Sequence, residues 1–130
     1  MSSEGFERQI KAGRICSGMN YYQKVWALTA RVPAGRVTTY AAIARALGGK
    51  AYRAVGGALN KNPYSPQVPC HRVVGNDGSL TGFAAGVDKK ARMLESEGVR
   101  VSGGRVDRSC VIDERQLGAV KTKKDGRKRG

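Results

Sequence analysis

The sequence predicts a mainly α-helical domain with short strands, organised as a winged-helix-like helix-turn-helix. This domain carries a loop around Cys70 (residues 69–73), which we call the cysteine loop. Three observations lead to this fold class. Apolar residues recur at helical spacing in three segments between residues 20 and 60. The pair Gly48-Gly49 separates the last two segments, as the turn of a helix-turn-helix requires. Short valine-rich pairs bounded by glycine turns follow the loop and indicate small strands.

The first predicted helix begins near residue 20 and ends before Pro33-Ala34-Gly35. Its apolar face is spaced i, i+3, i+4, i+7 and consists of Tyr22, Val25, Trp26 and Thr29. The only tryptophan therefore lies on the buried face. We expect Trp26 to anchor the core and not to serve as a platform for a ligand.

The second helix is expected to begin at Thr38-Thr39, where a hydroxyl can cap the first unpaired amides. Its buried stripe is Tyr40, Ile43, Ala44 and Leu47. The third helix is expected from about residue 51 to 60. The side chains predicted to face inward are Tyr52, Val55, Gly56 and Leu59, and those predicted to be exposed are Arg53, Ala54, Gly57, Ala58 and Lys61.

The glycine pair inside the third helix calls for a physical reason, because each glycine costs a helix about 1 kcal/mol relative to alanine. We expect Gly56 to permit close helix packing. We expect Gly57, with Ala54 and Ala58, to let a ligand approach the helix backbone closely. Arg53 at the start of the helix makes nucleic acid the natural candidate for that ligand.

Beyond the cysteine loop, Val73-Val74 predicts a short strand, and Asp88 is expected to cap a helix from residue 89 to 97. The apolar stripe of this helix is Val87, Ala91 and Leu94, which leaves Glu97 at the margin of the core. Segments 99–101 and 105–106 are expected to pair. We therefore divide the chain into an N-terminal arm or short helix (1–19), a central domain (20–106) and a basic, disordered tail (107–130).

The charge balance favours a polyanionic partner. The 130 residues include 24 Lys+Arg against 10 Asp+Glu, giving a net charge of +14 and a pI of about 10.3. Without a basic amphipathic helix, this charge favours nucleic acid over a membrane. No long apolar run or signal pattern is present, so we expect an intracellular protein of the cytoplasm, nucleoid or nucleus. We further expect a monomer.

The cysteine content argues against a metal or disulfide framework. There are three cysteines, far apart in the sequence and without a Cys-x-x-Cys pair, and a single histidine. One histidine cannot complete the usual zinc pattern, and an odd number of dispersed cysteines is typical of reduced thiols. We therefore expect no metal and no cofactor.

The candidate site is the segment Pro69-Cys70-His71-Arg72-Val73, which places a thiol beside the only imidazole. A buried, inert Cys70 is the alternative. In an extended segment neighbouring side chains point to opposite faces, so proton transfer from Cys70 to His71 needs a bridging water or a turn. His71 also needs a carboxylate partner, for which Glu97 is the better candidate and Asp77 the poorer.

The run Asn62-Pro63-x5-Pro69-Cys70-His71-Arg72-Val73-Val74 closely resembles the active-site segment of the O6-alkylguanine-DNA alkyltransferases, or methylated-DNA–protein-cysteine methyltransferases. The likeness extends from about residue 22 to 98 and includes Arg53-Ala54-Val55-Gly56-Gly57-Ala58. It implies that Cys70 accepts the alkyl group of an O6-alkylguanine flipped out of duplex DNA, once per molecule. It further implies that His71 takes the thiol proton through a water while Glu97 holds His71.

The same resemblance implies roles for residues outside the dyad. Tyr40 is expected to donate a proton to the departing guanine and to crowd its phosphate, and Arg53 to fill the vacated stack. Asn62 is expected to tie the third helix to the loop. The small residues Ala54, Gly57 and Ala58 are expected to admit that helix to the minor groove. The base pocket is expected to be lined by Val73, Phe83, which replaces the usual tyrosine, and Ala84.

Three other functions stay open at this point. The first is a non-catalytic alkyltransferase-like protein that only recognises the lesion. Such proteins have another residue in place of the cysteine of this motif, whereas this chain has Cys70. The second is a plain helix-turn-helix DNA-binding protein in which Cys70 is packing. The third is a thiol hydrolase, for which no oxyanion signature is present.

Overall fold

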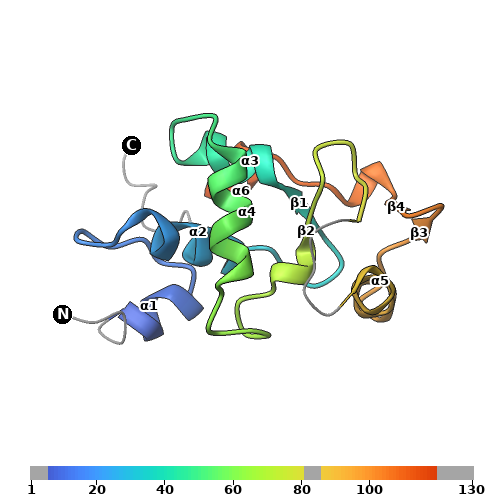
Figure 1. Ribbon diagram of the computed structural model, residues 1–130, viewed down its shortest axis with the longest axis horizontal. Coiled ribbons are helices and arrows are strands. Elements are labelled where there is room, and N and C mark those ends of the chain that lie inside the picture. The colour runs from blue at the N-terminus through green and yellow to red at the C-terminus, as the bar shows by residue number, and fades with distance from the viewer. Residues whose placement is uncertain (1–5, 81–85, 120–130) are drawn as a thin grey trace.

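The computed structural model describes residues 6–80 and 86–119 and shows a mainly helical fold with short strands, as predicted (Figure 1). The helices are α1 (Glu7–Lys11), α2 (Tyr21–Ala30), α3 (Tyr40–Ala46), α4 (Tyr52–Asn60), α5 (Val87–Ser96) and α6 (Glu114–Ala119). The strands are β1 (Thr38–Thr39), β2 (Val73–Val74), β3 (Val101–Ser102) and β4 (Arg105–Val106). Two 3₁₀ turns are η2 (Cys70–Arg72) and η3 (Arg108–Cys110). In Figure 1, α4 crosses the middle of the view, between α1 and α2 on one side and α5 with β3 and β4 on the other.

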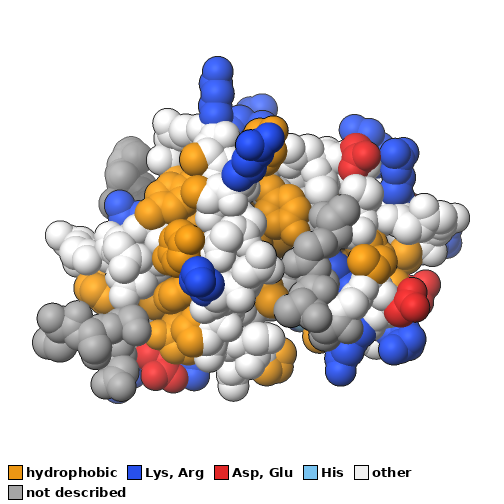
Figure 2. All heavy atoms as spheres, in the orientation of Figure 1, with side chains coloured by type: hydrophobic (Ala, Val, Ile, Leu, Met, Phe, Trp, Pro, Cys, Tyr) orange, Lys and Arg blue, Asp and Glu red, His pale blue; other side chains and the backbone are white. Residues whose placement is uncertain are grey.

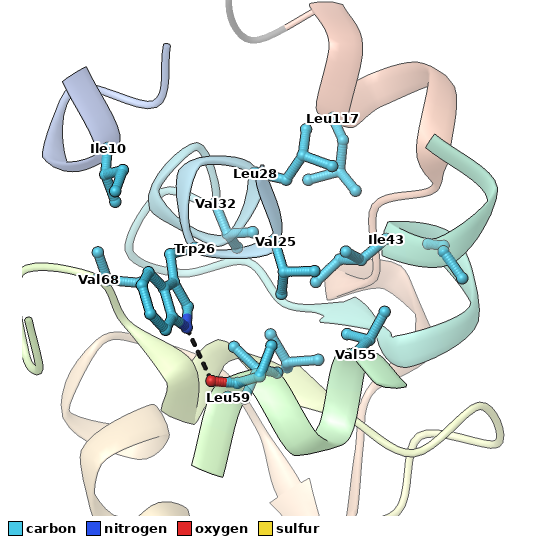
Figure 3. Close-up of a cluster of buried hydrophobic side chains, with 14 of the residues drawn as sticks. Ile10, Val25, Trp26, Leu28, Val32, Ile43, Val55, Leu59, Val68 and Leu117 are labelled. Carbon is cyan, nitrogen blue, oxygen red and sulfur yellow. Dashed lines mark hydrogen bonds between the residues drawn. The ribbon is translucent and has the colours of Figure 1, made fainter. Parts of the chain in front are cut away.

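Helix α2 begins with a capping box. The Asn20 side chain accepts a hydrogen bond from the Gln23 amide at 2.9 Å, and the Gln23 side chain accepts one from the Asn20 amide at 2.9 Å. Trp26 is 7% exposed and its indole nitrogen donates to the Ala58 carbonyl at 2.7 Å (Figure 3). Because this bond joins α2 to α4, the predicted role of Trp26 as a core anchor is confirmed.

The helix-turn-helix consists of α3 and α4. The Thr39 hydroxyl caps α3 by accepting from the Ala42 amide at 3.0 Å, as predicted. Gly48 then turns the chain with a φ of +88°, a conformation that glycine adopts without strain. The prediction that Tyr52 faces inward is wrong, because its side chain is 45% exposed. Tyr52 is the first residue of α4, where the chain has not yet reached the core.

The small residues of α4 are arranged differently from the prediction. Ala58 is 0% exposed and faces the core, so it does not belong to the exposed surface. A Cβ placed on Gly57 would lie 3.2 Å from the Tyr22 hydroxyl, whereas a Cβ on Gly56 would meet no described atom within 4 Å. Gly57 therefore serves helix packing and Gly56 lies on the open face, which reverses the two expected roles.

Two small sheets complete the domain. Strands β1 and β2 pair in parallel, with Thr38 opposite Val73 and Thr39 opposite Val74. This pairing places the start of α3 beside the segment that follows the cysteine loop. Strands β3 and β4 pair antiparallel, as predicted for segments 99–101 and 105–106. A second apolar cluster packs α5 against both sheets and comprises Val37, Val74, Leu80, Leu94, Val99 and Val106.

Both ends of the described chain pack onto this core. Ile10 of α1 is 0% exposed, so the N-terminal segment contains a docked short helix. The predicted loss of order after residue 107 is wrong for residues 107–119. There, Leu117 of α6 is 0% exposed, and the Ile112 carbonyl accepts from the Thr38 hydroxyl at 2.7 Å. Residues 120–130, which hold most of the lysines and arginines of the tail, lie outside the described residues, and the domain boundaries stay a prediction.

No helix within residues 6–80 and 86–119 combines the length and apolar character that a membrane span requires.

Candidate active site

The cysteine loop is held in place from the end of α4. The Asn62 side chain donates to the Val68 carbonyl at 2.8 Å and accepts from the Tyr64 amide at 2.9 Å. The Cys70 amide also donates to the Val68 carbonyl, at 2.9 Å. These bonds fix the backbone immediately before η2, and they place Asn62 between α4 and the loop, the position that the family resemblance implies. Cys70 is a half-buried thiol outside any disulfide.

His71 forms a buried pair with Glu97. The imidazole is 4% exposed, and its Nε2 lies 3.0 Å from Oε2 of Glu97, which immediately follows α5. The carboxylate is an acceptor only, so it selects the tautomer with the proton on Nε2 and leaves Nδ1 as a proton acceptor. The expected partner of His71 is therefore the one present. Asp77 instead accepts hydrogen bonds from Ser79 and pairs with Arg105.

The backbone at the dyad is a turn and not an extended strand. Cys70, His71 and Arg72 form η2, in which successive side chains point about 120° apart. No hydrogen bond directly joins the Cys70 thiol to the His71 ring among the described contacts. Proton transfer between the two therefore requires a bridging water, one of the two arrangements that the sequence left open.

Sequence reasoning gave no role to Arg72, which clamps the carboxylate. Its Nε donates to Glu97 Oε1 at 2.9 Å and its Nη2 to Oε2 at 2.7 Å, a bidentate pair. Its Nη1 donates to the Val32 carbonyl at 2.7 Å. Glu97 is thus fixed by two residues of the cysteine loop. The signal in the sequence was the arginine directly after the dyad, but its partner lies 25 positions away.

The electrostatics of the pair keep His71 neutral and Glu97 ionised. Burial lowers the pKa of His71 below its ordinary 6.5 and outweighs the opposing effect of Glu97. Burial by itself raises the pKa of Glu97, but hydrogen bonds from Arg72 and His71 together hold that pKa below its ordinary 4.5. At neutral pH the imidazole is therefore ready to accept a proton, and the carboxylate is ready to stabilise the cation that results.

Lys90 is a second residue that the sequence analysis missed. It is 1% exposed, and its Nζ donates to the Val73 carbonyl at 2.6 Å, next to η2. Burial lowers the pKa of Lys90 to about 8, an effect that the electrostatic interaction with Cys70 opposes. Residue 90 precedes Leu94 by four positions, so helical spacing already placed this lysine on the buried face, whereas Val87, predicted for the apolar stripe, is 43% exposed.

The remaining predicted residues lie on the helix-turn-helix or beside it. Tyr40 is half-buried at the start of α3, and Arg53 is exposed as the second residue of α4. Ala54 is half-buried, whereas Ala58 is excluded from this surface by its burial. Of the predicted base pocket, Val73 is 0% exposed. Phe83 and Ala84 lie outside the described residues.

The described part of the chain contains no group of three or more His, Cys, Asp and Glu side chains suited to a metal ion.

On the face shown in Figure 2, Lys and Arg side chains extend from several places and acidic side chains reach the surface in only a few. The structure therefore defines a class of protein: a helix-turn-helix fold of the DNA-binding type, with a loop that holds a cysteine next to a buried imidazole–carboxylate pair.

Residues 20–99 match the family described as 6-O-methylguanine DNA methyltransferase, DNA binding domain. Because the match extends over more than half of the 130 residues, the chain belongs to this family. The methylated-DNA–protein-cysteine methyltransferase of Methanosarcina barkeri is 46% identical over 81 residues, which are 62% of this chain and 51% of that protein. The corresponding protein of Salmonella typhimurium is 45% identical over 82 residues, 62% of this chain and 48% of that protein. The chain thus spans about half the length of these relatives.

Two solved structures, both complexes with DNA, are similar to this chain. Mycobacterium tuberculosis OGT in complex with DNA is 35% identical, with a TM-score of 0.59, and the match covers 73% of this chain and 65% of that one. S. pombe Atl1 in complex with damaged DNA containing O6-carboxymethylguanine is 31% identical, with a TM-score of 0.60, and the match covers 71% of this chain and 94% of that one.

Proposed function

We propose that this protein repairs DNA directly, by moving the alkyl group of an O6-alkylguanine onto the sulfur of Cys70 in a single, irreversible turnover. The observation that carries the proposal is the His71–Glu97 pair behind the cysteine. A cysteine that only fills space needs no buried neutral imidazole beside it, nor a carboxylate clamped at 2.7 Å by Arg72. The family match and the retained nucleophile support the same reaction.

The proposed chemistry starts with formation of the thiolate. The thiol proton of Cys70 passes through a water to Nδ1 of His71, and Glu97 stabilises the resulting imidazolium. The buried ammonium of Lys90 favours the thiolate electrostatically, because it lies beside the turn that bears the sulfur.

Transfer then takes place at the alkyl carbon. The sulfur–carbon bond forms while the bond from that carbon to O6 of guanine breaks, and the bonding electrons stay on the guanine. The Tyr40 hydroxyl donates a proton to the departing base and regains one from solvent. The product is a thioether, which water does not cleave at neutral pH. Each protein molecule therefore reacts once and is consumed as a stoichiometric acceptor.

The base must leave the duplex before the thiol can reach it, and extrusion costs about a few kcal/mol. Arg53 is suited to offset that cost by filling the vacated stack, since it is exposed and makes no ion pair with the described residues. Gly56 leaves the surface of α4 open for close approach of the DNA backbone. The net charge of +14 attracts the phosphates irrespective of sequence.

A base pocket that includes Phe83 and Ala84 stays part of the proposal. Val73, the third residue predicted for it, is 0% exposed and accepts a hydrogen bond from Lys90 through its carbonyl, so its own contact with the base would need a local opening. We further propose that the protein acts as a monomer and without a cofactor, in the compartment that holds the DNA.

The proposal is tested by measuring how much O6-methylguanine remains in DNA after incubation with the protein. A duplex with a single O6-methylguanine is incubated with excess protein, digested to nucleosides and analysed by chromatography. We expect the lesion to be replaced by guanine, in an amount equal to the active protein when DNA is in excess. Cys70→Ser should leave the lesion in place, and persistence of the lesion with the unaltered protein would reject the proposal.

The alternative is a non-catalytic protein that recognises the lesion and recruits other factors. The observation that favours it is the match to S. pombe Atl1, of which the chain covers 94% at a TM-score of 0.60. Cys70 argues against it, because recognition alone needs no nucleophile. This alternative predicts tight, lesion-selective binding of the duplex with unchanged lesion content.

A further inference from the structure

The short N-terminal helix α1 is fixed to the rest of the fold at two points. Ile10 is 0% exposed and belongs to the main core cluster. Just after the helix, the Gly13 carbonyl accepts a hydrogen bond from Nε of Arg31 at 2.8 Å, at the end of α2. Gly13 has a φ of +75°, and a Cβ there would lie 2.9 Å from Cγ of Arg31, so a larger residue would disturb this contact. The helix is therefore firmly docked, and none of the steps proposed above gives it a role.

Lys11, the last residue of α1, reaches the segment that precedes the cysteine loop. Its Nζ lies 5.7 Å from the centroid of the Tyr64 ring, within the range of a cation–π interaction. Glu7, one turn earlier in α1, pairs with the same Nζ at 2.7 Å. Because the ion pair already restricts the lysine side chain, less conformational entropy is lost in keeping its ammonium over the ring.

Tyr64 is held by a second aromatic contact. Its ring centroid lies 5.7 Å from that of Trp26 and the two planes meet at 90°, an edge-to-face arrangement. Tyr64 is half-buried, and its hydroxyl makes no hydrogen bond with any residue that the structure describes. The contacts that hold Tyr64 therefore act on its ring and not on its hydroxyl.

The backbone of Tyr64 is linked to that of Cys70 by two consecutive hydrogen bonds. The Tyr64 carbonyl accepts from the Val68 amide at 2.9 Å, and the Val68 carbonyl accepts from the Cys70 amide at 2.9 Å. Val68 is 0% exposed and lies beside the indole of Trp26 in the main core cluster (Figure 3). A displacement of Tyr64 is therefore transmitted to the backbone that carries the sulfur.

We propose that α1 positions the nucleophile: Lys11 and Trp26 together hold the ring of Tyr64, and Tyr64 aligns Cys70 through Val68. Lys11 and Tyr64 are positioning residues, which act on the reaction through the cysteine loop. The inference rests on the proposed function, because it concerns the rate of the same alkyl transfer. Neither residue lies on α3 or α4, so loss of their contact should slow the transfer and leave the binding of DNA unchanged.

The test measures methyl transfer from an O6-methylguanine duplex in single turnover, at a series of concentrations of excess protein. Each time course gives a rate constant and an amplitude, and the series gives the half-saturating concentration. We expect Lys11→Met to lower the limiting rate constant about threefold and Tyr64→Leu about tenfold, with an unchanged half-saturating concentration. The double variant should be no slower than Tyr64→Leu, because the cation no longer has a ring to act on.

Conservative variants and a matched control separate positioning from stability and from charge. Lys11→Arg keeps a cation and Tyr64→Phe keeps the ring, so both should recover the rate constant of the unaltered protein. Arg8→Met removes an exposed cation from the same helix and is the control for lost charge. A contact that only stabilised the fold would lower the amplitude, which reports the active fraction of the protein, and would leave the rate constant unchanged.

Unaltered rate constants in both Lys11→Met and Tyr64→Leu would overturn the inference and leave the proposed function intact. Equal slowing in Lys11→Met and Arg8→Met would also overturn it, as would a change confined to the half-saturating concentration, since Lys11 would then act on DNA through its charge. If the unaltered protein transfers no methyl group, the proposed function fails, and this inference fails with it.

Discussion

His71 and Arg72, adjacent in the chain, share one carboxylate oxygen: both contact Oε2 of Glu97, at 3.0 and 2.7 Å. The cysteine loop is thereby fastened to the end of α5 by two contacts of different character. Arg72 keeps Glu97 ionised, and Glu97 in turn keeps the proton of His71 on Nε2. A single carboxylate therefore both holds the loop in place and sets the tautomer of the imidazole.

Removing the clamp should destabilise the fold. In Arg72→Met, Glu97 loses a bidentate partner in a largely buried position, where its side chain is 18% exposed. We expect the free energy of unfolding to fall by about 2–4 kcal/mol, measured by urea denaturation. Arg105→Met, which breaks the exposed pair with Asp77, is the matched control and should cost less than about 1 kcal/mol. Equal effects of the two substitutions would contradict the clamp.

Neutralising the carboxylate should make the thiol harder to ionise. Glu97→Gln can still accept a hydrogen bond at the same place, but it no longer stabilises an imidazolium. The rate at which iodoacetamide alkylates Cys70 rises with pH as the thiol ionises. We expect this rise to occur at a higher pH in Glu97→Gln than in the unaltered protein. The pH profile is measured by mass spectrometry of the Cys70 peptide, with the Cys110 peptide as an internal control. An unchanged profile for Cys70 would show that the relay is wrong.

Lys90 should give the protein an unusual alkaline stability profile. Its pKa is about 8 in the fold and 10.5 ordinarily, so between these pH values the unfolded chain binds more protons than the folded one. The free energy of unfolding should therefore rise with pH across this window, by about 2 kcal/mol relative to Lys90→Met. Urea denaturation of both proteins at pH 7.5 and pH 10 gives this difference. A parallel pH dependence in the two proteins would mean that burial does not lower the pKa of Lys90.

Arg53 should matter for duplex DNA and not for an isolated base. Arg53→Ala removes the side chain proposed to fill the vacated stack, so repair of a duplex should slow by about tenfold or more. The reaction with isolated O6-benzylguanine should keep its rate, because no base has to be extruded. Arg14→Ala, which removes an exposed arginine of the N-terminal segment, is the control for lost charge. Equal slowing on both substrates would contradict the proposed role.

Much of the fold follows from local patterns in the sequence. The spacing of Val25, Trp26 and Thr29 predicted the buried face of α2, and Thr39 predicted the start of α3, because both signals act within one or two helical turns. Local periodicity failed at both ends of α4. Tyr52 has an apolar spacing but precedes the core. Ala58 follows Val55 by three positions and is buried with it, so the error there was to assign a small residue of the apolar face to the exposed surface.

The features that sequence reasoning missed depend on distant partners. Arg72 is important because Glu97 lies beside it, and Lys90 is buried because the Val73 carbonyl accepts its ammonium. Helix α6 escaped notice because it is short and its Leu117 packs on residues far earlier in the chain. A composition rich in charge predicted disorder there, but contact with α3 and with the Thr38 hydroxyl outweighs that tendency.

The central claim is that the sulfur of Cys70 permanently receives carbon from the base, and intact mass followed by peptide mapping tests it most directly. After incubation with excess O6-methylguanine duplex, the protein should gain the mass of one methyl group, located on the peptide that contains Cys70. Cys16→Ser and Cys110→Ser should gain the same group, whereas Cys70→Ser should gain none. An unchanged mass beside an active control transferase, or a methyl group on any other residue, would contradict the account.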